Sequence, residues 1–477
     1  MFLPLRNSAS VQSPRETVSA RPASSAHATS KGTTRRLAIA ATLVCGLLRT
    51  PVVTAQSGPP ADIDPQIEKL VAAVSQDRLE QLLQALVTFG TRNTLSDATS
   101  ATRGIGAARQ WILDELTRTN PKLQVSFDTH QIPMGGRITR DVELRNVVAV
   151  LPGRSPRRIY VSGHYDTVSL GAQGQGGINS GAADADRSNE NADAPGANDD
   201  ASGVVLVMEL ARVFAESGLD FDATLVFMAV AGEEQGLIGS RQHARRMNER
   251  NIPIQALFNN DIVGGAVGGD GIVDAATIRL YSEGPEDSPS RSLAQFTRRV
   301  ATRYVPSHRI RLMARRDRFG RGGDHTAFNL EGLAAVGFRE SRENYSKQHA
   351  AADTIDGVSF PYLLQNARVN AAAMATLALA PPPPVIYTAQ GQPMLDRRPS
   401  GYDARLRWNA SPGAAGYRIF WREAWGPDWQ HELFVGNVTE YVLPHANIDD
   451  VVFGVAAVGP GGHESTVSVY VPPPANY

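Results

Sequence analysis

The chain has 477 residues, with 47 lysines and arginines against 48 aspartates and glutamates, so its formal net charge is −1. This length allows two or three domains with a substantial buried core. The even charge balance gives no reason to expect a nucleic acid or an anionic membrane surface as the main partner.

The first 55 residues read as an extension that leads into an export signal. Arg35 and Arg36 precede an apolar stretch over residues 37–48, and a small-residue cleavage site follows at residues 53–55. The apolar stretch is too short to span a bilayer comfortably, although a single membrane anchor is the alternative. We therefore expect a secreted or periplasmic protein with no stable membrane span after signal cleavage.

The only cysteine, Cys45, lies inside this apolar stretch. Cleavage would leave a chain without any thiol, which excludes disulfides, a cysteine nucleophile and a thiolate metal site. Metal ligands in the mature protein must then be histidine, aspartate and glutamate.

Helical and strand patterns alternate in the next part of the chain. Apolar residues recur at helical spacing over residues 67–89 and 106–116. Short runs rich in valine, isoleucine and aromatic residues then occupy residues 144–153, 158–168 and 223–234. This alternation predicts an α/β fold, a mixed and largely parallel sheet flanked by helices, with functional groups at the carboxyl ends of the strands.

Residues 171–193 are almost wholly glycine, alanine, asparagine, serine and aspartate, a composition that predicts a mobile loop. Four prolines at 381–384 form a semi-rigid spacer. We therefore expect a catalytic domain over residues 61–380, a linker over 381–384 and a further domain over 385–477.

The last domain reads as an all-β sandwich, because short alternating segments are separated by proline and glycine turns. It is similar to a fibronectin type III domain in Trp408, Tyr417, Trp421 and the ending "AVGPGGHES". Trp425 and Trp429 are either packed aromatics or exposed ones that bind a polymer or a surface.

Two adjacent aspartates, Asp199 and Asp200, stand directly before an apolar run with helical spacing over residues 204–214. A side-chain oxygen at this position caps a helix, but capping needs only one such oxygen. The second carboxylate needs another explanation.

Other histidines and carboxylates follow the predicted strands or lie later in the chain. They are His164 and Asp166 in "SGHYDTV", Glu233 and Glu234 in "GEEQGLIGS", Asp261 in "NND", and His349 in "QHAAADT". Each motif alone is typical of a solvated loop, but together they supply ligand types that suit zinc in a site without thiolate.

In this order the motifs "HYD", "NDDASG", "GEEQGLIGS", "NND" and a histidine followed four residues later by "DT" resemble the secreted bacterial leucyl aminopeptidases of metallopeptidase family twenty-eight. The resemblance covers residues 86–380. It implies the zinc exopeptidase fold, two zinc ions, and peptide or protein amino termini as substrate.

The resemblance also assigns the ligands. One zinc would be held by His164 and Asp261, the other by Glu234 and His349, and Asp199 would bridge them. A bridging carboxylate suits two metals because two cations a few ångströms apart repel each other unless an anion lies between them.

The same resemblance gives Glu233 and Asp166 catalytic roles. Glu233 would be the general base that takes a proton from the attacking water and passes it to the leaving amine. Asp166 would accept the second ring N–H of His164 and orient that ligand. Asp200 would stand behind the ligands, joined to Asp199 by a cis peptide bond.

Two features depart from the family or stay open. Family members often have tyrosine before the last histidine as an oxyanion donor, whereas this chain has Gln348, with Tyr345 nearby. Asp324 and His325 in "GGDHTAF" are either pocket residues or a structural pair.

Three alternatives to an aminopeptidase remain from the sequence. They are a glutaminyl cyclase with one zinc, another zinc exopeptidase such as a carboxypeptidase or dipeptidase, and a binding protein without activity. The complete set of two-metal ligands argues against the one-zinc cyclase, and this set with the glutamate base argues against a binding protein. A carboxypeptidase or dipeptidase stays open.

Overall fold

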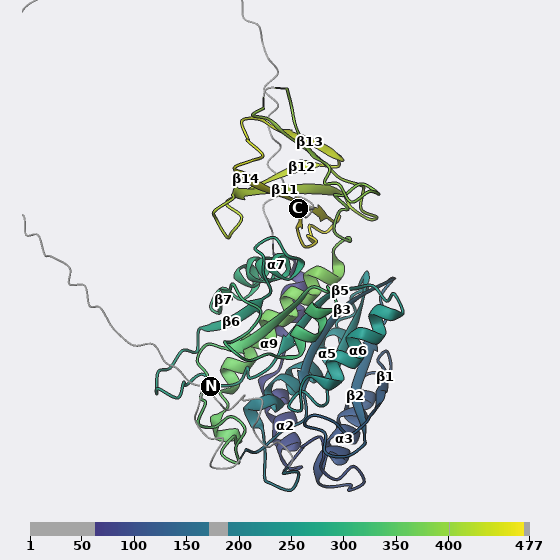
Figure 1. The fold of residues 1–477 in the computed structure, drawn as a ribbon, viewed down its shortest axis with the longest axis vertical. Helices are drawn as coiled ribbons and strands as arrows, with labels where there is room; N and C mark the ends of the chain where they lie inside the picture. Colours follow the sequence, from purple (N-terminus) through teal and green to yellow (C-terminus); the bar gives the residue numbers. More distant parts are fainter. Residues whose placement is uncertain (1–62, 171–188, 400, 472–477) are drawn as a thin grey trace, which may run out of the picture. The chain divides into compact units, whose positions relative to one another are not determined.

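The computed structural model describes residues 63–170, 189–399 and 401–471 (Figure 1). The expected export segment, Cys45 and most of the glycine-rich loop lie outside these residues. Among the helices that are described, none is long and apolar enough to cross a membrane.

A mixed eight-stranded sheet organises the larger part, with strand order β1-β2-β4-β3-β5-β8-β6-β7 (Figure 1). The strands are β1 (Gln124–Ile132), β2 (Val142–Leu151), β3 (Ser155–His164), β4 (Ala223–Val230), β5 (Ile254–Asn260), β6 (Thr277–Ser282), β7 (Arg309–Met313) and β8 (Ala335–Glu340). The four central strands β4, β3, β5 and β8 are parallel, whereas β1, β2 and β6 pair antiparallel with their neighbours toward the centre.

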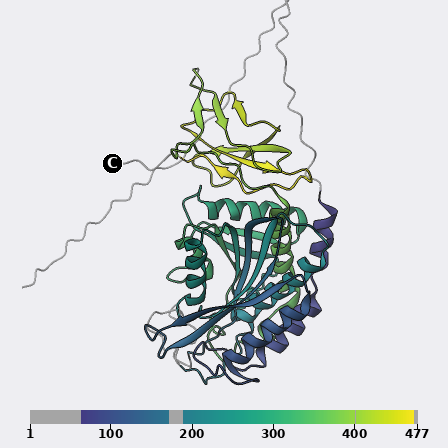
Figure 2. The same ribbon diagram turned by 90° about the vertical axis from the view of Figure 1, so that its right-hand side faces the viewer.

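Helices cover both faces of this sheet (Figure 2). One face packs against α1 (Pro65–Ala72), α2 (Gln76–Val87), α3 (Gly104–Thr119), α5 (Ser202–Glu216), α7 (Pro289–Tyr304) and α9 (Phe360–Leu379). The other face packs against α6 (Ile238–Glu249) and α8 (Asp324–Leu330). The expected α/β fold, a largely parallel sheet between helices, is confirmed.

Alternation along the central strands divides their side chains between the two faces. In β4, Leu225 and Phe227 lie in the core beneath α5 and α9, and Val226 and Met228 lie in the core beneath α6 and α8. Every residue of β4 is buried. A strand buried on both faces reads as a continuous apolar run, as the sequence of β4 does.

The C-terminal residues form two antiparallel sheets, as expected for an all-β part. The first, in the order β13-β10-β9, contains β9 (Leu395–Arg397), β10 (Ala404–Arg407) and β13 (Glu440–Leu443). The second, in the order β12-β11-β14-β15, contains β11 (Gly416–Glu423), β12 (His431–Gly436), β14 (Val451–Val458) and β15 (Ser468–Val469).

The aromatic residues of this part divide between core and surface. Trp408 and Tyr417 are buried, with ring centroids 5.4 Å apart. Trp429 packs against Phe420 at 5.9 Å, whereas Trp425 is 78% exposed. Packing therefore accounts for Trp429 and not for Trp425.

Candidate metal centre

The predicted ligands meet at the carboxyl edge of the central strands. His164 is the last residue of β3, Glu234 follows β4 and Asp261 directly follows β5. His349 lies in the loop after β8. Because these four strands are parallel neighbours, their carboxyl ends lie along one edge of the sheet.

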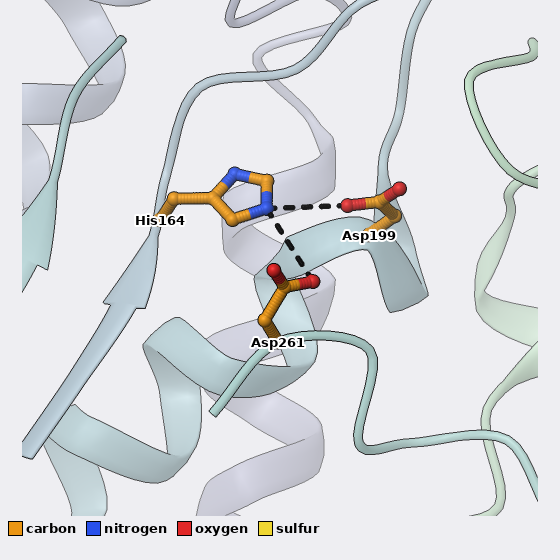
Figure 3. A group of neighbouring side chains, drawn as sticks. All are labelled: His164, Asp199 and Asp261. Carbon is orange, nitrogen blue, oxygen red and sulfur yellow. Dashed lines mark ion pairs between the residues drawn. The ribbon is translucent and has the colours of Figure 1, made fainter. Parts of the chain in front are cut away.

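His164, Asp199 and Asp261 form the first group of ligand atoms. Figure 3 shows Nε2 of the His164 ring facing both carboxylates. Nε2 lies 3.2 Å from Oδ1 of Asp199 and 3.7 Å from Oδ1 of Asp261. All three residues are buried.

His349, Glu234 and Asp199 form the second group. Nε2 of His349 lies 3.2 Å from Oδ2 of Asp199 and 3.2 Å from Oε1 of Glu234. In each group the candidate ligand atoms lie within 4.8 Å of one another. The two oxygens of Asp199 therefore face two different histidines.

This set of donors fits zinc on chemical grounds. Two imidazole nitrogens and three carboxylates, all buried, are ligands that zinc accepts in the absence of thiolate. Three buried carboxylates this close together would repel one another without nearby positive charge, so a metal ion between them removes an electrostatic conflict.

Asp199 and Asp200 have different contacts, which explains why two adjacent aspartates are present. Their peptide bond is cis, as the family resemblance implied. Asp200 accepts hydrogen bonds from the main-chain N–H groups of His164 at 2.9 Å, Gly203 at 2.9 Å and Ile262 at 3.2 Å. Asp200 therefore caps the start of α5 and ties it to the ends of β3 and β5, while Asp199 faces the histidines.

The expectation that the carboxylate of Asp166 orients His164 is wrong about the atom involved. Nδ1 of His164 lies 3.0 Å from the main-chain oxygen of Asp166 and 3.8 Å from its carboxylate. The carboxylate instead accepts the N–H groups of Glu233 and Glu234, each at 3.1 Å. The main chain of Asp166 orients the histidine, because its side chain is turned toward the neighbouring loop.

Glu233 lines the same pocket as the ligands and is half-buried. Removal from water, opposed by His164 and reinforced by the carboxylates of Asp261 and Glu234, raises the pKa of Glu233 well above its ordinary value. A carboxylate with a raised pKa accepts a proton more readily near neutral pH, as a general base must.

Gln348 occupies the position of the tyrosine that family members often have, and its amide contacts two protein side chains. Its Nε2 donates to Glu343 at 2.9 Å and its Oε1 accepts from Arg321 at 2.9 Å. The amide oxygen and one N–H of the amide are therefore engaged within the protein. Tyr345 is 41% exposed and lies beneath the Arg321 guanidinium, 6.0 Å from it.

The "GGDHTAF" motif lies at the start of α8, outside both ligand groups. Nε2 of His325 lies 2.8 Å from the main-chain oxygen of Arg316. Asp324 is buried, and the desolvation of its carboxyl raises its pKa to about 7. The contact with Arg316 gives His325 a structural role. No hydrogen bond between Asp324 and His325 is found in the described part of the chain.

The model of the family described as Peptidase family M28 matches residues 146–374. A probable zinc metalloprotease of Pyricularia oryzae is 36% identical over 450 residues, covering 86% of this chain and 85% of the relative. A second one, of Pyrenophora teres f. teres, is 36% identical over 443 residues, covering 85% and 87%. The chain belongs to peptidase family M28. It is a zinc-dependent peptidase.

Solved structures with a similar fold support the architecture of this M28 peptidase. LapB from Legionella pneumophila has a TM-score of 0.51 at 22% identity, covering 68% of this chain and 78% of that chain. The LapA aminopeptidase of the same organism has a TM-score of 0.50 at 18% identity, covering 67% and 76%. Both similarities show that the chain shares their fold.

Three buried residues that support the ligands of the M28 site were not predicted from the sequence. Arg339 of β8 contacts Oδ1 of Asp261, and together with His164 it outweighs the effect of burial and lowers the pKa of Asp261. Asp353, from the "DT" motif, accepts the N–H of Asp199 at 2.8 Å. Arg92 donates to the main-chain oxygens of Tyr165, next to His164, and of Gly196, three residues before Asp199, and only these distant partners reveal its role.

Proposed function

We propose that this M28 peptidase is an aminopeptidase with two zinc ions, which removes residues from the amino termini of peptides and proteins. The shared carboxylate of Asp199 carries the proposal, because its two oxygens each lie 3.2 Å from a different histidine, His164 and His349. A carboxylate between two cations offsets their repulsion, so this geometry suits two metal ions rather than one.

The chemistry divides between the metals and the chain. Zinc bound here would lower the pKa of a water molecule and polarise the scissile carbonyl. Glu233 takes the proton of the attacking water on its carboxylate and returns it to the leaving amine. Asp166 keeps Glu233 in place by accepting its main-chain N–H at 3.1 Å.

Acidic groups in the pocket suit a free α-amine, which is the group that distinguishes an aminopeptidase substrate. Glu233 and Glu234 both line the pocket. We expect the positively charged amine of the substrate to lie beside them, which places the first peptide bond at the metals.

Two measurements test the proposal together. Metal analysis of the active protein is expected to give two zinc ions per chain, and exhaustive chelation is expected to abolish activity. Digestion of a mixed peptide library is expected to shorten peptides from the amino end. Shortening from the carboxyl end, or cyclisation of amino-terminal glutamine with one zinc per chain, would contradict the proposal.

We also propose that the protein is exported and that its C-terminal sheets form a fibronectin type III-like domain that binds a polymer or a surface. The export signal at residues 35–55 and the 78% exposed side chain of Trp425 support this. Amino-terminal sequencing of the secreted protein is expected to find Gln56 first. Trp425→Ala is expected to weaken retention on an insoluble polymer that retains the full-length protein.

A further inference from the structure

Arginines line the pocket beside the candidate metal ligands. They are Arg137, Arg318, Arg321 and Arg339. Zinc bound by the carboxylates would cancel much of the negative charge of the pocket. An arginine whose charge is incompletely compensated would then suit an anionic group of the substrate.

Two of these arginines are occupied by protein acceptors. Arg339 contacts Asp261 and donates to the main-chain oxygen of Gly322 at 3.1 Å. Arg318 donates to Asp317 at 3.0 Å and to Glu343 at 2.7 Å. Their role is to hold the carboxylates and the loop in place.

Arg321 differs because the one carboxylate that contacts it among the described residues, Glu343, is shared. Nη1 of Arg321 lies 3.5 Å from Oε2 of Glu343, but the same oxygen accepts from Arg318 at 2.7 Å and from Gln348 at 2.9 Å. Arg279 contacts the other oxygen of Glu343. One carboxylate therefore serves three arginines, and Arg321 is the most distant of them.

The guanidinium of Arg321 is nevertheless held in a fixed position. Nη1 donates to Oε1 of Gln348 at 2.9 Å, and the Tyr345 ring lies 6.0 Å from the guanidinium carbon. Among the described residues, only Nη1 of this guanidinium has a hydrogen-bond acceptor. Burial and the neighbouring charge of Arg318 lower the pKa of Arg321, as expected for a cation whose charge is incompletely compensated.

We propose that Arg321 binds a carboxylate of the peptide substrate, next to the scissile bond. A guanidinium with donors at Nε and Nη2 can bind a carboxylate through two parallel hydrogen bonds. Such a group in the same pocket as Glu233 favours short peptides or peptides with an acidic residue after the first. This inference rests on the proposed function, because it assumes peptide cleavage at the adjacent metals.

The carboxylate can come from the carboxyl terminus of a dipeptide or from an acidic side chain, and matched substrates separate these sources. Leucyl-glycine is compared with leucyl-glycinamide, and leucyl-aspartyl amide with leucyl-asparaginyl amide. For at least one pair the wild-type protein is expected to favour the acid. Arg321→Gln is expected to lower that acid-to-neutral ratio of kcat/KM by about tenfold or more, because a charged hydrogen-bonded pair is lost.

Arg342→Gln is the matched control, because Arg342 is an exposed arginine of the same region that pairs with Asp270 outside the pocket. Its acid-to-neutral ratio is expected to equal that of the wild type. Arg321→Lys is expected to give an intermediate ratio, since an ammonium keeps the charge without the planar pair of donors.

Binding measured without turnover distinguishes failure of this inference from failure of the proposed function. Calorimetry on zinc-loaded Glu233→Gln is expected to show tighter binding of the acid than of the neutral peptide, and Arg321→Gln in that background is expected to remove the difference. Equal binding of acid and neutral peptides would overturn the inference, even if the enzyme trims amino termini. An equal loss of kcat on all four peptides, with the ratio unchanged, would also overturn it and would assign Arg321 to the oxyanion instead.

Discussion

At the residue scale, the adjacent residues Glu233 and Glu234, which follow β4, have different environments. The side chain of Glu234 reaches His349 at 3.2 Å, whereas Glu233 lines the pocket without joining either ligand group. We expect Glu233→Gln to keep both zinc ions and lose at least about 100-fold in kcat, since positioned proton transfer contributes about that much. Glu234→Gln is expected to lose one zinc, because an amide is a poorer ligand than a carboxylate.

Zinc content and turnover of the two variants are measured side by side. The assignment is wrong if Glu233→Gln turns over normally. It is equally wrong if Glu233→Gln loses a zinc while Glu234→Gln retains both.

Protonation of His164 and His349 predicts how zinc affinity depends on pH. Burial disfavours the charged form of His349, but Glu234 and Asp199 outweigh burial and raise its pKa to about 9 in the metal-free chain. The pKa of His164 is also raised, because Glu233 and Asp199 outweigh burial there. Zinc needs neutral imidazole, so binding must displace these protons at any pH below their pKa.

Zinc affinity is therefore expected to fall as pH falls, by up to about tenfold per pH unit for each histidine. Competition with a chelator at about pH 8, 7 and 6 measures this slope. An affinity that stays constant over this interval would show that the histidines are already neutral before zinc binds.

At the scale of elements, Arg92 holds together the two ends of the connection that leads from β3 to α5. It is fully buried, and it donates to the main-chain oxygens of Tyr165 at 2.6 Å, Pro195 at 2.6 Å and Gly196 at 3.0 Å. Tyr165 follows His164, and Gly196 precedes Asp199 closely in the chain. Arg92 therefore fixes the distance between two of the ligands.

We expect Arg92→Met to lower the free energy of unfolding by at least about 3 kcal/mol, since each carbonyl left without a donor costs about 1–3 kcal/mol. Denaturant unfolding of the zinc-loaded protein measures this change. Arg118→Met is the control, because the Arg118 side chain is 65% exposed. An equal midpoint for Arg92→Met and the wild type would refute the role of Arg92.

The sequence predicted elements well where burial is continuous and poorly where it is not. Residues 204–214 carry helical spacing and lie in α5, and the apolar runs after residue 144 became β2, β3 and β4. Strand β1 was not identified, because it lies at the edge of the sheet and most of its side chains are polar and partly exposed. Edge strands lack the apolar pattern on which such predictions depend.

A helix boundary was also missed within residues 67–89. The apolar spacing continues through this stretch, but the structure has two helices, α1 and α2. The Ser75 side chain accepts the N–H of Arg78 at 3.2 Å and begins α2. The cap decides the boundary, and hydrophobic spacing alone does not contain that information.

In the site, local sequence motifs predicted the ligands but not the residues that support them. Motifs at strand ends showed which histidines and carboxylates the sheet would bring together. Arg92 and Arg339 act through partners far away in the chain, so no local pattern marks them. The sequence also did not show which atom of Asp166 contacts His164. Its main-chain oxygen does so, while its carboxylate accepts from Glu233.

For the whole molecule, the large sheet and the C-terminal sheets have separate hydrophobic cores. The side chains that pack against the large sheet form clusters that end at Ala378, and the clusters of the C-terminal part begin at Ile386. The described candidate ligands all precede the prolines at 381–384. Each part therefore has its own buried core, which is the usual condition for folding alone.

A chain that ends at Ala380 is accordingly expected to bind two zinc ions and to cleave small aminoacyl anilides at a rate within about threefold of the full chain. The expectation follows because no ligand and no residue that contacts one is removed. Metal analysis, circular dichroism and anilide turnover are measured on both proteins. A shortened protein that folds and holds two zinc ions but cleaves no anilide would show that the C-terminal part shapes the active site, and binding of a polymer would then not be its only role.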